Sequence, residues 1–131
     1  MLLWREMDEK AMLTHCERLA DTVRQLSPVL IYLSQPDTRQ TIQRAAEERH
    51  NPDGWRWIDW VIEYIENSAY GKRNRVKGFD GAMEYFELRK ALELKALGQL
   101  SMPHVIIDNP DYDWDAVWQK IVSYLEGALL Q

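Results

Sequence analysis

A short basic segment in the middle of the chain carries the side chains best suited to bind phosphate. Four cations lie within six consecutive positions, Lys72, Arg73, Arg75 and Lys77. Guanidinium and ammonium groups donate charge-assisted hydrogen bonds to phosphate oxygens, and a loop that closes over a ligand can place them there. We therefore interpret residues 68–78 as an exposed, basic, lid-like loop. A run of solvated charges without a ligand is the alternative interpretation.

A second group of polar residues follows the two short apolar runs of the chain. Residues 35–37 follow the first run, residues 28–34, and a similar group follows the second run, residues 103–108. The second group consists of Asn109, Pro110 and Asp111. In open α/β sheets, ligands bind beyond the carboxyl ends of the strands. Both groups are therefore candidates for a ligand-binding edge, and ordinary strand-to-helix turns are the alternative.

Other catalytic chemistry has little support in the sequence. The phosphate-binding pattern Gly-x-x-x-x-Gly-Lys-Ser/Thr is lacking, because Arg73 follows Gly71 and Lys72. Cys16 lies on the apolar face of an expected helix, and His15 points about 100° away around the axis, so they do not form a nucleophile and base. The three histidines and one cysteine lack metal-ligand spacing. We therefore predict no catalytic residue and no metal ligand.

The two apolar runs, residues 28–34 and 103–108, are predicted to be strands. Each leads through a turn containing proline and aspartate into an expected helix. Residues 35–102 between them have helical patterning, so the strands can share a sheet only as a parallel pair with a helical crossover. The predicted fold is therefore a three-layer α/β arrangement, mostly helical, with two parallel strands.

Apolar residues at three- and four-residue spacing predict the helices. The expected helices cover about residues 6–26, 37–49, 55–67 and 79–100, followed by a last helix with an apolar stripe. That stripe contains Trp114, Val117, Trp118, Ile121 and Leu125. Asp37 is a suitable N-cap for the second helix, with Gln40 three positions later, and Asp111 or Asp113 caps the last one. The apolar residues between 79 and 100 do not stay on one side of the expected helix, so we do not predict which side of this helix is buried.

Length, composition and charge restrict the class of protein. The 131 residues, with 46% hydrophobic content, suit one domain in which residues 1–27 form an N-terminal helix. The net charge of -5 argues against nucleic acid or an anionic membrane as partner. The chain opens without a signal pattern and has one cysteine, and no apolar run approaches the roughly 20 residues of a membrane helix. We therefore expect a cytoplasmic protein.

The order of these elements resembles the C-terminal half of P-loop kinases of the thymidylate and deoxynucleoside kinase type. The resemblance covers residues 28–125 and rests on ordered elements, without one diagnostic motif. They are a strand, a Pro/Asp turn, an arginine-bearing helix, a further helix, a basic segment, a long helix, a second strand and a final helix with tryptophan. The resemblance implies that this α/β chain is kinase-like over most of its length.

The resemblance also implies roles for the two groups of candidate residues. The residues that it places on phosphates are Arg73 and Arg75, with Lys72 and Lys77 beside them. The residues that it places around the nucleotide base are Asn109, Pro110 and Asp111. The possible ligand is therefore a nucleotide.

The phosphate-binding loop and first strands of that family have no counterpart here. Most backbone donors for the phosphates and a hydroxyl ligand for magnesium are therefore missing. We expect a catalytically incomplete, nucleotide-associated domain, for which ATP with magnesium would be the cofactor only if an N-terminal half completed the fold. The alternative is a non-enzymatic protein–protein interaction or dimerisation module.

The resemblance has a consequence for assembly. Without the central strands of the full fold, the strand at residues 28–34 has an unpaired edge. Two such edges that pair across a two-fold axis would satisfy each other. We therefore expect a homodimer through this sheet edge, with the helix at residues 55–65 or the first helix contributing apolar area.

Overall fold

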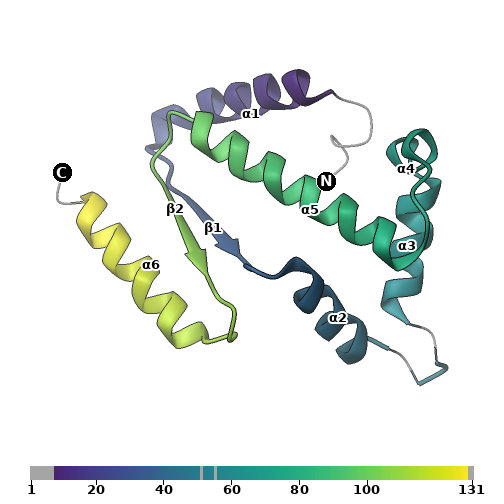
Figure 1. Ribbon diagram of the computed structural model, residues 1–131. Helices are drawn as coiled ribbons and strands as arrows, with labels where there is room; N and C mark the ends of the chain where they lie inside the picture. Colours follow the sequence, from purple (N-terminus) through teal and green to yellow (C-terminus); the bar gives the residue numbers. More distant parts are fainter. Residues whose placement is uncertain (1–7, 51, 55, 130–131) are drawn as a thin grey trace.

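The two predicted strands pair in the computed structural model of the chain, which describes residues 8–50, 52–54 and 56–129 (Figure 1). Strands β1 (Leu30–Ser34) and β2 (His104–Asp108) are parallel. Their register places Leu30 opposite His104 and Ser34 opposite Asp108. The predicted parallel pair with a helical crossover is therefore confirmed. Within the described part of the chain the sheet contains only these two strands, so each has one unpaired edge.

Helices make up most of the described chain. They are α1 (Glu9–Val23), α2 (Thr38–Glu48), α3 (Trp57–Asn67), α4 (Ala69–Asn74), α5 (Gly78–Gln99) and α6 (Trp114–Leu129). A 3₁₀ turn at Arg24–Leu26 extends α1 toward β1. Figure 1 shows the strands between α5 and α6, with α2 and α3 beyond the carboxyl end of β1. The start of the expected helix at Trp55 and the first two residues of the expected helix 6–26 lie outside the described residues.

Aspartate side chains begin three of these helices. The carboxylate of Asp37 accepts a hydrogen bond from the backbone N–H of Gln40 at 2.8 Å, which confirms the predicted cap of α2. Asp113 accepts from the N–H of Ala116 at 3.0 Å, so Asp113 rather than Asp111 caps α6. Asp8 caps α1 in the same way. Each cap satisfies a backbone donor that the first helical turn cannot pair internally.

The segment at residues 68–78 is not the loop that we expected, because it contains helix α4. Ser68 caps α4: its hydroxyl accepts from the N–H of Gly71 at 2.9 Å and donates to the carbonyl of Ile65 at 2.6 Å. Gly71 is buried, and a Cβ atom there would lie 2.0 Å from the same carbonyl oxygen. The absence of a side chain therefore lets α4 pack directly against the end of α3.

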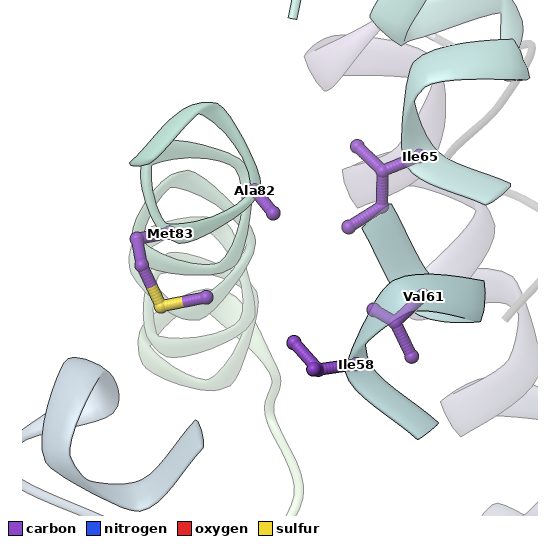
Figure 2. Packing of buried hydrophobic residues seen from close by; sticks show 5 residues of the cluster. All are labelled: Ile58, Val61, Ile65, Ala82 and Met83. Atoms are coloured by element: carbon purple, nitrogen blue, oxygen red, sulfur yellow. The ribbon is translucent and has the colours of Figure 1, made fainter. Parts of the chain in front are cut away.

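The main hydrophobic cluster lies between α3 and α5. Figure 2 shows its buried members, Ile58, Val61 and Ile65 from α3 with Ala82 and Met83 from α5. Burial of such side chains contributes about 25 cal/mol per Å² of apolar surface removed from water. The first half of α5 is therefore oriented by its contact with α3.

The second half of α5 contacts a different helix. Ala96 and Leu97 are buried there, and an ion pair joins Lys95 to Glu9 of α1. Because the two halves of α5 pack against different elements, its buried residues do not form one stripe, which explains why the apolar residues change sides along this helix.

None of the helices described has the length and apolar character needed to cross a bilayer.

Candidate functional site

A cleft of about 710 Å³ lies beyond the carboxyl ends of the two strands. Residues 35–37 after β1 and residues 110–112 after β2 line it together with one face of α2. The structure therefore brings Pro110 and Asp111, both predicted site residues, to the same cleft as Asp37. This is the position at which parallel α/β sheets bind ligands.

The turn that forms one wall of this cleft is attached to α5. The ammonium group of Lys90 donates hydrogen bonds to the carbonyl oxygens of Gln35 at 2.6 Å and Pro36 at 2.9 Å. The guanidinium of Arg39 forms an ion pair of 2.7 Å with Asp80 at the start of α5. These contacts fix the first turn of α2 relative to the sheet, so the cleft has one wall of defined position.

An arginine and a tyrosine meet across the cleft. The guanidinium carbon of Arg44 lies 4.0 Å from the ring centroid of Tyr112, a cation–π contact. Tyr112 has a left-handed backbone conformation with φ of 57°, which is uncommon for a residue other than glycine. The Nε of Arg44 donates to Glu48 at 2.9 Å, and this hydrogen bond raises the pKa of Arg44. The pair forms a flat, cationic surface in the cleft.

Carboxylates outnumber cations in the lining of the cleft. Its acidic residues are Asp37, Glu47, Glu48 and Asp111, and its basic residue is Arg44. Clustered carboxylates repel the negative charge of free phosphate. The cleft is therefore poorly suited to a phosphate chain.

Asn109 lies at the end of β2, next to the cleft but not in its lining. Its backbone N–H donates to the carbonyl of Ser34 at 3.1 Å and extends the pairing of the strands. Its side chain is buried, and the amide nitrogen Nδ2 has no hydrogen-bond partner among the described residues. A buried donor without a partner costs about 1–3 kcal/mol. Asn109 is therefore a buried side chain beside the cleft with an unsatisfied amide donor.

The predicted phosphate-binding cations lie elsewhere. Lys72 and Arg73 belong to α4, and Arg75 follows it in a left-handed conformation with φ of 55°. All three are exposed, and within the described chain none has an ion-pair partner. Lys77 instead forms an ion pair of 2.9 Å with Glu66. None of these four side chains lines the cleft at the strand ends.

Glu66 connects α3 to the start of α5. Besides its ion pair with Lys77, it accepts a hydrogen bond from the N–H of Gly78 at 2.8 Å. The bond from Gly78 and then the one from Lys77 lower the pKa of Glu66. Lys77 is thus committed to a structural contact, in contrast to the three cations before it.

Sequence reasoning did not identify Arg44 and Tyr112 as site residues. Their contact joins positions far apart in the chain, and only the proximity of Tyr112 to Pro110 and Asp111 pointed toward it.

Within the described residues, no group of His, Cys, Asp and Glu is arranged to hold a metal ion. The chain matches no protein-family model, no curated protein and no solved structure.

Proposed function

We propose that this chain is a nucleotide-associated domain of P-loop-kinase type that does not transfer a phosphoryl group by itself. The observation that carries the proposal is the pair of Arg44 and Tyr112 in the cleft beyond the parallel strands. A nucleobase stacks readily on tyrosine rings and on guanidinium planes, and each such contact is worth about 1–3 kcal/mol. The cleft would receive the base, bordered by Pro110 and Asp111.

The charge of the cleft refines this proposal. Because its carboxylates outnumber its one cation, the phosphates of a bound nucleotide would point away from it. Arg73 and Arg75, which the resemblance assigns to the phosphates, are exposed and free of ion pairs among the described residues, but neither lines the cleft, so the geometry does not join them to a base bound there. ATP would bind better with magnesium than without it, because the metal ion neutralises part of the phosphate charge.

The test is a calorimetric titration of the purified chain with adenosine, thymidine, ATP and dTMP, each with and without magnesium. We expect a dissociation constant of about 100 μM or lower for at least one nucleoside, which corresponds to about 5.5 kcal/mol. Arg44→Ala and Tyr112→Ala should each weaken binding about tenfold, the effect of losing one stacking surface.

The chain provides a matched control for Arg44. Arg49, the residue that follows α2, also stacks on an aromatic ring, with its guanidinium carbon 5.2 Å from the centroid of Trp57, but it does not line the cleft. Arg49→Ala should therefore leave the affinity unchanged. Arg73→Ala combined with Arg75→Ala should leave nucleoside binding unchanged, because neither residue lines the cleft, and a loss of nucleotide affinity would show that the phosphates reach α4. Absence of binding at millimolar nucleoside, or equal losses for Arg44→Ala and Arg49→Ala, would contradict the proposal.

The second candidate is a non-enzymatic interaction module. The observation in its favour is the exposure of large apolar side chains, with Trp114 58% and Trp118 63% exposed one turn apart on α6. Exposed apolar patches on a small domain often mark interaction surfaces. If the nucleosides fail to bind while the chain self-associates, this candidate replaces the nucleotide proposal.

A further inference from the structure

The outer edge of β1 has unpaired backbone groups in the middle of the strand. The N–H of Leu30 donates to the carbonyl of Pro103 at 3.0 Å, and the carbonyl of Ser34 accepts from Asn109 at 3.1 Å, so both residues face β2. Alternate residues of a strand direct their backbone groups to opposite edges. Ile31 and Leu33 therefore present their amide and carbonyl groups at the open edge.

This edge lacks the features that usually prevent a strand from pairing with another chain. The sequence of β1 contains no charged residue, and the side chain of Leu33 is 45% exposed. The outer edge of β2 differs, because that strand ends at Asp108, whose side chain is a carboxylate. Charged side chains at an edge discourage pairing between molecules. Of the two open edges, that of β1 is the one suited to a partner strand.

The exposed surface of the chain is larger than a compact monomer requires. Its accessible surface is 9407 Å². A compact monomer of 15.5 kDa exposes about 7,200 Å², so the excess is about 2,200 Å². A standard protein interface covers about 800 Å² on each partner. This whole-chain excess is larger than that area but is not assigned to the β1 edge, so the choice of partner rests on the unpaired backbone groups of the strand.

We infer that a second copy of this chain docks on the β1 edge, so that the two β1 strands pair antiparallel across a two-fold axis. A register centred on Tyr32 places Ile31 of each copy opposite Leu33 of the other. Both copies then satisfy the backbone groups of these residues and cover the exposed Leu33 side chains. For the proposed interaction module, the partner is therefore a second copy of the same chain. The proposed nucleotide cleft lies within one chain, so it does not depend on the dimer.

The experiment compares two substitutions on opposite edges of the sheet. Leu33→Lys places a charge at the β1 edge, and Ile106→Lys places one at an equally exposed position of β2, where Ile106 is 46% exposed. Sedimentation equilibrium between about 1 and 100 μM measures the mass. The wild-type chain should have twice the monomer mass of 15.5 kDa. Leu33→Lys should raise the dimer dissociation constant by at least about 30-fold, and Ile106→Lys should leave it unchanged.

Hydrogen exchange of the wild-type chain is a second measurement. It needs no substituted chain, so misfolding of a variant cannot affect it. The amides of Ile31 and Leu33 should be protected at high protein concentration and should exchange faster on dilution. A monomer at 100 μM would overturn the inference. So would a dimer in which these amides exchange freely, or one that Ile106→Lys dissociates while Leu33→Lys does not. Nucleoside binding by the monomer would show that the cleft proposal stands without the dimer.

Discussion

Gly71→Ala tests whether the basic segment is docked on α3 or is a free loop. The alanine Cβ would lie 2.0 Å from the carbonyl oxygen of Ile65 and 2.9 Å from that of Glu66. Backbone atoms cannot give way as the end of a flexible side chain can, so α4 must move away from α3 by about 1 Å or more. Such overpacking typically costs about 1–3 kcal/mol.

The same movement would break the cap of α4. The hydroxyl of Ser68 accepts from the N–H of Gly71 at 2.9 Å, and a displacement of this size removes that hydrogen bond. Loss of a serine cap costs about 1 kcal/mol. We therefore expect Gly71→Ala to lower the free energy of unfolding by about 3 kcal/mol in total. For a chain of this length the melting temperature should fall by about 12 °C.

Gly98→Ala is the matched control, because Gly98 also lies in a helix but a Cβ atom there would meet nothing within 4 Å. Removal of a helical glycine should raise the free energy of unfolding by about 0.5 kcal/mol. The measurement is urea denaturation followed by circular dichroism. A loss smaller than about 0.5 kcal/mol for Gly71→Ala would refute the docking of α4, because an exposed loop would tolerate the methyl group.

Three further predictions concern stability and assembly. Burial and then the hydrogen bond to Glu93 raise the pKa of Tyr32 from 10.0 to about 12, so stability should fall as pH rises from about 10 to 12; Tyr32→Phe should flatten this part of a pH series of urea denaturations. Asp37→Ala should lower the free energy of unfolding by about 1 kcal/mol through loss of the α2 cap, and Asp37→Asn should recover most of it in the same assay. Because each chain carries a net charge of -5, the dimer should tighten as salt rises from about 10 to 150 mM in sedimentation equilibrium.

The strands and their parallel arrangement were predictable because the signals are local. Each apolar run is followed by a turn with proline and aspartate, and the residues between the runs permit only a helical crossover. The α2 cap was predictable for the same reason, since Asp37 and Gln40 are three positions apart. Signals that are complete within a few residues do not depend on the rest of the fold.

Helix α4 and the cleft depend on contacts between distant residues and were not fully predictable. Glycines and clustered cations favour a loop, whereas the helix forms because Ser68 and Gly71 fit against Ile65. Pro110 and Asp111 were assigned to a binding edge, but the contact of Arg44 with Tyr112 requires the folded chain. The pairing of distant side chains is set by tertiary packing, which no local pattern records.

The parallel pairing of β1 and β2 also sets an order of events in folding. The strands are separated in sequence by the whole of α2 to α5, so closing that long connection costs chain entropy before any strand contact compensates for it. Helices form faster than such distant pairings. The helical core between α3 and α5 should therefore assemble first, and the sheet last. Because residues 35–37 and 110–112 of the cleft follow the two strands, the cleft would take its final shape only when the sheet forms.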